Sequence, residues 1–177
     1  WYCEVRGMST GDSWAAGVNI DSDTPNATTV GGLNAITVYN RSVMLNGIEN
    51  DYGASENQLA GLGVNKFQAG DVLGIHIDMD AGGKVWFSRN GTQFDAPLGH
   101  QGGSGPQGDP AAGTNEIGTV YNPNDEELYF MVFAGSSAIC HTNFGQNPSF
   151  NNSFTGGDVG TQVREGGTFK YMPATGY

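Results

Sequence analysis

The stretch from Gly70 to Gly91, GDVLGIHIDMDAGGKVWFSRNG, decides the fold expected for this chain. Its first half alternates with period two, so one face carries Leu73, Ile75, Ile77 and Met79, and the other carries Val72, His76 and Asp78. The following Asp-Ala-Gly-Gly supplies residues that tolerate a tight reversal. A return run rich in aromatic and β-branched residues comes next. The sequence therefore predicts a half-buried strand, a turn, a second strand and a further turn at Asn90-Gly91.

The same alternation recurs at short intervals on both sides of this hairpin. Strands are expected at 1–6, 14–20, 35–39, 42–45, 128–134 and 138–144, with a short closing strand near 168–173. No long helix and no internal repeat is visible. Short strands at this spacing predict an all-β protein with two antiparallel sheets packed as a sandwich.

Composition agrees with one β-rich domain spanning 1–177. The chain has 177 residues, enough for a sizeable core, with 29 glycines and only 14% charged residues. Its net charge of −11, with seven Lys and Arg, weighs against binding nucleic acid or anionic membranes. No targeting, membrane-spanning or lipidation motif is present. Because the chain begins inside an expected strand, we expect it to be a piece of a longer protein.

The segment 98–127 is the least regular part and is expected to form a long surface loop. It carries several glycines and prolines, and loops of this length are unusual in compact domains. Two interpretations stay open, an insertion that the fold tolerates and a loop that contacts a partner. The polar segments 21–34 and 51–62 are further candidate contact loops.

Reactive residues do not form a recognisable catalytic set. Cys140 and His141 are neighbours on an expected strand and so point to opposite faces. Cys3 and Cys140 are expected to be buried free thiols, with a single disulfide as the alternative. Asp78 and Asp80 fit a turn-capping pair better than the paired carboxylates of a glycosidase. The same run lacks the later ligands of a calcium loop, so no metal or cofactor is expected.

Three segments together resemble the SPRY domain family. The first is the opening Trp1-Tyr2-Cys3-Glu4-Val5. The second is Gly70-Asp71-Val72-Leu73-Gly74 with Asp78 and the run Phe87-Ser88-Arg89-Asn90-Gly91. The third is Leu128-Tyr129-Phe130 with the run from Asn143 to Phe150. These motifs occur in order across nearly the whole chain. The resemblance implies a bent, concanavalin-like sandwich that acts as a non-catalytic binding module through loops at one end.

The signature residues also have expected structural roles. Asp71 is expected to cap a turn, and Asn143 and Gln146 are expected to satisfy backbone groups after the last strand. Four aromatic side chains are expected to anchor the core: Trp14, Phe87, Phe130 and Phe144.

The closing run 167–177 is similar to the end of SPRY segments in bacteriophage structural and tail proteins. This implies a virion or extracellular setting, in which the loops recognise a host surface ligand or another subunit of a larger, oligomeric assembly. The ligand would be a protein or a glycan, with candidate contacts at Tyr52, Tyr121, Asp21 and Asp23. The alternatives are a purely structural decoration domain, a SPRY adaptor of a cellular protein, and a glycan-active enzyme.

Overall fold

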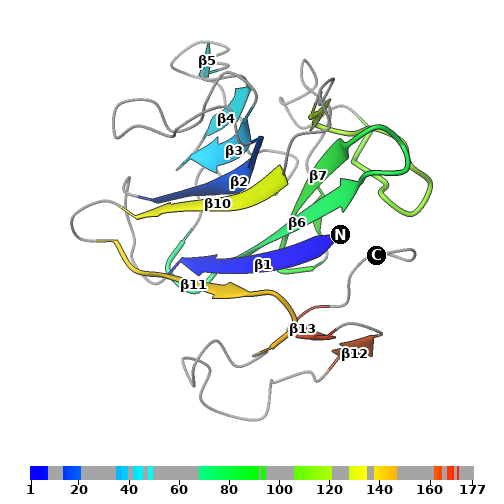
Figure 1. Cartoon of the computed structure of the whole chain (residues 1–177). Coiled ribbons are helices and arrows are strands. Elements are labelled where there is room, and N and C mark those ends of the chain that lie inside the picture. The colour runs from blue at the N-terminus through cyan, green and yellow to red at the C-terminus, as the bar shows by residue number, and fades with distance from the viewer. Residues whose placement is uncertain are drawn as a thin grey trace.

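The computed structural model describes the chain in thirteen pieces. They are residues 1–7, 14–20, 35–39, 42–45, 48–49, 68–91, 93–94, 106–120, 128–134, 138–146, 162–164, 167–169 and 171. The regular elements within these pieces are all β-strands (Figure 1).

The larger sheet has six antiparallel strands in the order β11-β1-β6-β7-β8, with β9 pairing with β7. Its strands are β1 (Tyr2–Gly7), β6 (Val72–Asp78), β7 (Lys84–Arg89), β8 (Gln93–Phe94), β9 (Gly118–Thr119) and β11 (Cys140–Asn143). Strand β1 lies in the interior of this sheet, where Cys3 faces Ile75 of β6 and Glu4 faces Asn143 of β11. The first strand of the chain is therefore held between two strands that come much later in the sequence.

The second sheet has five antiparallel strands in the order β10-β2-β3-β4-β5. They are β2 (Trp14–Ile20), β3 (Ile36–Tyr39), β4 (Ser42–Leu45), β5 (Ile48–Glu49) and β10 (Leu128–Ala134). A separate two-stranded sheet pairs β12 (Gln162–Arg164) with β13 (Gly167–Phe169). In Figure 1 this pair lies away from β2 and β10, with the six-stranded sheet between them.

The two large sheets enclose one apolar core. The six-stranded sheet contributes Cys3, Val5, Leu73, Ile75, Ile77, Val85 and Phe87, and the five-stranded sheet contributes Trp14, Ala16, Val18, Ile36 and Val38. Each set occupies alternate positions of its strands, as expected where one face of each sheet meets the other. The prediction of an all-β, two-sheet antiparallel sandwich is confirmed.

The hairpin that decided the fold forms as predicted. Strands β6 and β7 pair with Ile75 opposite Phe87, and Asn90 adopts φ of 51° in the turn that follows. A positive φ suits Asn and Gly, which explains the Asn90-Gly91 pair at this point.

Three details of the sequence prediction are wrong. Strand β6 is buried on both faces rather than half-buried: His76, on the face away from the core, is only 1% exposed. Phe144 is 48% exposed and is not a core anchor, whereas Trp14 and Phe87 are buried and Phe130 packs partly against the core. Met79, which extends the alternating pattern, lies in the turn beyond β6 and is exposed.

Candidate functional site

The four residues chosen from the sequence as ligand contacts cannot be placed. Tyr52, Tyr121, Asp21 and Asp23 lie outside the described residues, as do the loops 21–34 and 51–62. The third candidate loop, 98–127, is described from 106 to 120. We refer to residues 106–120 as the capping segment, and it is the candidate site that the structure presents.

The capping segment is anchored in the core at its C-terminal end. Ile117 and Val120 are 3% and 4% exposed and belong to the core cluster. Between them, β9 pairs with β7, and the Ile117 amide donates to the Val85 carbonyl oxygen at 2.9 Å. The Val120 amide donates to the Gly83 carbonyl oxygen at 2.8 Å. This part of the expected surface loop is therefore built into the sandwich.

The N-terminal part of the capping segment forms a closed turn. Asp109 and Thr114 exchange two backbone hydrogen bonds of 3.0 Å, and the Asp109 carboxylate accepts the Ala112 amide at 3.0 Å. Gly113 and Asn115 take positive φ values of 68° and 57°, which the reversal requires. The turn thus has a defined conformation set by its own polar groups.

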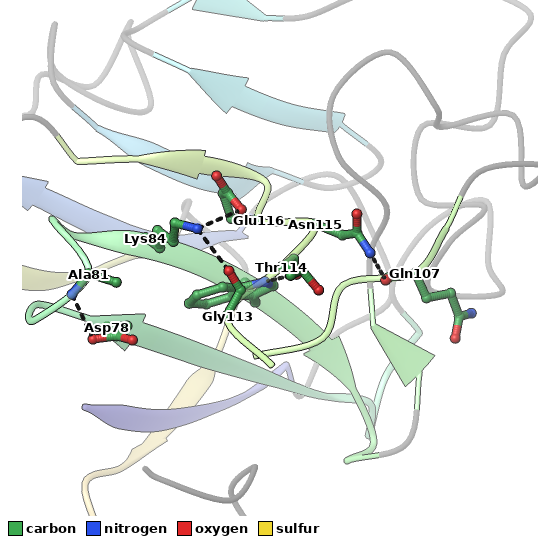
Figure 2. Close-up of polar contacts among 9 residues, drawn as sticks. Asp78, Ala81, Lys84, Gln107, Gly113, Thr114, Asn115 and Glu116 are labelled. Carbon is green, nitrogen blue, oxygen red and sulfur yellow. Dashed lines mark hydrogen bonds and ion pairs between the residues drawn. The ribbon is translucent and has the colours of Figure 1, made fainter. Parts of the chain in front are cut away.

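Two side chains of β7 hold this turn against the sheet. Lys84 Nζ donates to the Gly113 carbonyl oxygen at 2.8 Å and forms an ion pair with Glu116 at 3.4 Å (Figure 2). The indole Nε1 of Trp86 donates to the Thr114 carbonyl oxygen at 2.8 Å, and Trp86 is itself buried. Asn115 Nδ2 adds a bond to the Gln107 carbonyl oxygen at 3.1 Å. Strand β7 therefore positions the turn through its backbone and its side chains.

The surface that results is acidic, and most of its side chains are small. The exposed residues of the turn are Pro106, Gln107, Asp109, Ala111, Ala112 and Thr114, and the nearby β6–β7 turn adds Met79, Asp80, Ala81 and Gly82. In that turn Asp78 Oδ1 accepts the Ala81 amide at 3.0 Å, which confirms the turn-capping role predicted for Asp78 (Figure 2). Such a surface can contact a partner through backbone groups and shape, without an aromatic platform.

The opposite side of the six-stranded sheet from the core carries a buried polar cluster. At its centre the Glu4 carboxylate, 0% exposed, accepts hydrogen bonds from the Tyr2 hydroxyl (3.2 Å), Asn143 Nδ2 (3.0 Å) and the Tyr171 amide (2.7 Å). A buried carboxylate requires such donors because it has lost its hydration. The sequence marked Glu4 only as part of a motif, and nothing local revealed these partners from distant segments.

A second carboxylate in this region ties the β6–β7 hairpin together. The Asp71 carboxylate accepts hydrogen bonds from the Gln68 amide at 2.8 Å and from Asn90 Nδ2 at 2.9 Å. It also forms an ion pair with Arg89 Nε at 3.0 Å. Burial alone would raise the pKa of Asp71, but the hydrogen bonds from Arg89, Gln68 and Asn90 outweigh it and lower that pKa below 3.8. The predicted turn-capping role of Asp71 is confirmed.

Asn143 and Gln146 also act as predicted. Asn143 Oδ1 accepts the Gly145 amide at 3.0 Å, and Gln146 Oε1 accepts the Phe144 amide at 2.6 Å. Both side chains therefore satisfy backbone groups where β11 ends.

The structure also joins a serine and a histidine that the sequence did not connect. His76 Nε2 lies 3.2 Å from Ser88 Oγ, because the β6–β7 register brings these strands side by side. Both residues are buried, with His76 1% and Ser88 0% exposed. Burial lowers the pKa of His76 to about 3, which makes it a weak base at neutral pH. The distance between His76 Nε2 and Ser88 Oγ would suit a nucleophile and its general base, but neither group is accessible to solvent.

The two cysteines are free thiols, so the disulfide alternative is wrong. Cys3 is fully buried and faces Ile75, whereas Cys140 is half-buried and faces Gly7 at the other end of β1. Burial raises the pKa of both thiols, that of Cys140 to about 11. Neither is an activated nucleophile.

Comparisons with protein families and curated sequences found no relative of this chain. No protein-family model matches the chain, and no curated protein sequence is significantly similar to it. Within the described pieces, His, Cys, Asp and Glu side chains form no group of three or more suited to a metal ion. Those pieces also contain no helix long and apolar enough to cross a membrane.

Proposed function

We propose that this chain is a non-catalytic binding module of the SPRY type. It recognises a protein or glycan on a host surface, or a neighbouring subunit, as part of a virion or tail-fibre protein. The observation that carries this proposal is the capping segment, a turn exposed at its tip and fixed at its base by Lys84, Trp86 and the buried Ile117.

A turn fixed in this way favours recognition. Ordering a loop on binding costs about 0.5–1.5 kcal/mol for each immobilised long side chain, and a preformed turn of small residues avoids most of that cost. The exposed tip has Ala111 and Ala112, which have little side-chain entropy to lose. The geometry therefore suits a surface that meets its partner without rearrangement.

The family and setting rest on motif residues whose contacts are now known. Glu4, Asp71 and Asn90 belong to the segments that resemble SPRY domains, and each makes side-chain hydrogen bonds that join distant parts of the chain. The virion setting rests on the similarity of the closing run 167–177 to phage proteins. A non-catalytic role is supported by the burial of the Ser88–His76 pair, which keeps both groups away from solvent.

The test is a glycan and cell-binding screen of the whole chain with two matched variants. Ala112→Arg places a long charged side chain at the exposed tip, and Ala134→Arg places the same side chain at an exposed position of β10. We expect the wild type and Ala134→Arg to bind alike and Ala112→Arg to lose at least about tenfold in affinity, the equivalent of about 1.4 kcal/mol. Thermal unfolding of all three should coincide.

Three outcomes would count against this proposal. Equal binding by Ala112→Arg would remove the capping segment from the binding surface. Absence of binding across the panel, with recognition only inside an assembled particle, would favour a structural decoration role. Turnover of a polysaccharide that is lost in Asp78→Asn would favour an enzyme. Deletion of 98–127 is not a suitable variant, because it removes Ile117 and Val120 from the core.

A further inference from the structure

The turn that follows β7 contains a dipeptide that reacts without an enzyme. In Asn90-Gly91 the amide nitrogen of Gly91 attacks the side-chain carbon Cγ of Asn90, since glycine has no side chain to obstruct the approach. A bond forms between these two atoms, and Nδ2 of Asn90 leaves as ammonia with the proton of the Gly91 amide. Water then adds to one of the two carbonyl carbons of the cyclic imide, which opens to aspartate or isoaspartate.

Three hydrogen bonds hold Asn90 in the folded chain. Its backbone amide donates to the Val72 carbonyl oxygen at 2.9 Å, and its Oδ1 accepts a hydrogen bond from the Val72 amide at 2.9 Å. Its Nδ2 donates to Asp71 Oδ1 at 2.9 Å, and that carboxylate is ion-paired with Arg89 at 3.0 Å. Departure of Nδ2 as ammonia breaks the bond to Asp71 and needs a proton that an ion-paired carboxylate does not supply. The folded contacts therefore oppose the reaction.

From these contacts we infer that Asn90 is a deamidation site controlled by Asp71: it reacts when the Asp71–Asn90 contact opens, and the reaction prevents that contact from forming again. The product has a carboxylate where the Nδ2 group stood, so a charged oxygen would face Asp71 Oδ1 in place of the present 2.9 Å hydrogen bond. Two carboxylates at this distance repel each other, whereas the amide attracts. The step is therefore one-way, and water is its only co-reactant.

The position of Asn90 makes this change important for the sheet. Asn90 and Gly91 are half-buried, so solvent water can reach the imide, and they close one end of a hairpin whose strands β6 and β7 lie in the interior of the six-stranded sheet. The isoaspartate product also adds one methylene group to the main chain where Gly91 packs against Tyr171. At this point an added Cβ on Gly91 would already come within 2.5 Å of Tyr171 Cβ. A chain whose hairpin has once opened and reacted therefore keeps a permanently weakened hairpin end.

Peptide mapping of the whole chain by mass spectrometry, after incubation at pH 8, tests the inference. We expect Asn90 to deamidate at least about tenfold more slowly in the native chain than in guanidinium chloride, because only the opened fraction reacts. Asp71→Asn should raise the native rate at Asn90 by about tenfold, since it removes the charged acceptor of Nδ2. Ile117→Ala, which weakens the core elsewhere, and Asp80→Asn in the exposed turn should leave that rate at the wild-type value.

The consequence of the reaction is tested with Asn90→Asp, which keeps the acceptor for the Val72 amide and replaces the donor to Asp71. This variant should unfold at a lower urea concentration than the wild type, and adding Asp71→Asn to it should recover part of the loss, since the second change removes the repulsion. Equal deamidation rates in the native and denatured wild type, or an unchanged native rate in Asp71→Asn, would overturn the inference, as would wild-type stability of Asn90→Asp. If Asp71→Asn does not fold, the rate ratio in the wild type decides the protection, and Asn90→Asp decides the consequence.

Discussion

The carboxylate of Asp71 connects the two ends of the β6–β7 hairpin. It stands just before β6, and its partners Arg89 and Asn90 stand at the end of β7 and just beyond. The side-chain oxygen Oδ1 of Asn90 in turn accepts a hydrogen bond from the Val72 amide at 2.9 Å. The Asp and the Asn-Gly of the motif thus form one closed arrangement rather than two separate turns.

Replacing Asp71 with Asn should destabilise the fold by about 1.5–3 kcal/mol at pH 7, the usual effect of losing hydrogen bonds to a charged group. The pKa of Asp71 is lowered in the folded state, so its contribution is complete above the unfolded value of 3.8 and is lost as pH falls below it. Urea unfolding should therefore show a gap between wild type and Asp71→Asn that narrows below pH 3.8. A gap of constant size would contradict this account, and Asp80→Asn in the exposed turn serves as the control.

The two thiols should differ in reactivity towards iodoacetamide. At pH 8 the raised pKa of about 11 leaves Cys140 almost entirely as the unreactive thiol, and Cys3 is fully buried as well. Mass spectrometry of the native chain should show slow labelling at Cys140 and none at Cys3. In urea without reductant both should label quickly. Failure of both to label in urea would indicate a disulfide.

Among the larger elements, the capping segment shows how an irregular stretch becomes part of a core. Ile117→Ala should cost about 2–5 kcal/mol, because it removes buried methylene groups and leaves a cavity between the sheets. Ala112→Ser, at the exposed tip of the same segment, should change stability by less than about 0.5 kcal/mol. Urea unfolding measures both. Similar small effects for both variants would show that the segment is peripheral.

The sequence predicted the elements whose pattern is local. Strands 14–20, 42–45 and 128–134 have the predicted bounds, since local runs of strand-forming residues mark where each of them begins and ends. The prediction that β6 is buried on one face only was wrong, because burial of its second face depends on other segments, which alternation within β6 does not report. The prediction that Phe144 anchors the core was wrong for a similar reason. Its aromatic side chain is typical of a core residue, but Phe144 lies just beyond the end of β11 and is exposed.

The site was less predictable than the fold. The length and composition of 98–127 marked it as a candidate contact loop. Its anchoring depends on hydrogen bonds from Lys84 and Trp86 to the backbone of Gly113 and Thr114. No spacing in the sequence connects these two pairs of residues. Glu4 meets Tyr171 across 167 positions of the chain. Contacts of this kind depend on strand order and register, which single-sequence patterns do not contain.

At the scale of the whole molecule, stability should depend on pH through His76. Its pKa is about 3 when folded and 6.5 when unfolded, so the unfolded chain binds an extra proton between these values. His76 therefore leaves the free energy of unfolding unchanged above pH 6.5 and lowers it as pH falls below that value. The slope of the free energy of unfolding approaches about 1.4 kcal/mol per pH unit. Urea unfolding at pH 7, 6 and 5 measures this slope.

Two variants separate this effect from the general titration of an acidic protein. His76→Gln should remove this part of the slope, whereas His141→Gln, at a half-buried position of β11, should retain it. Equal slopes in wild type and His76→Gln would show that another group dominates the pH dependence.

The interior place of β1 in the six-stranded sheet has a consequence for biosynthesis. Its hydrogen-bonding neighbours are β6 and β11, so the opening strand leaves the ribosome well before either of its partners exists. Strand pairings so distant in sequence form slowly, and unpaired edges meanwhile invite association with other nascent chains. We therefore expect chaperones to bind the opening strand until residue 143 has left the ribosome. The six-stranded sheet can form only after most of the present sequence has been translated.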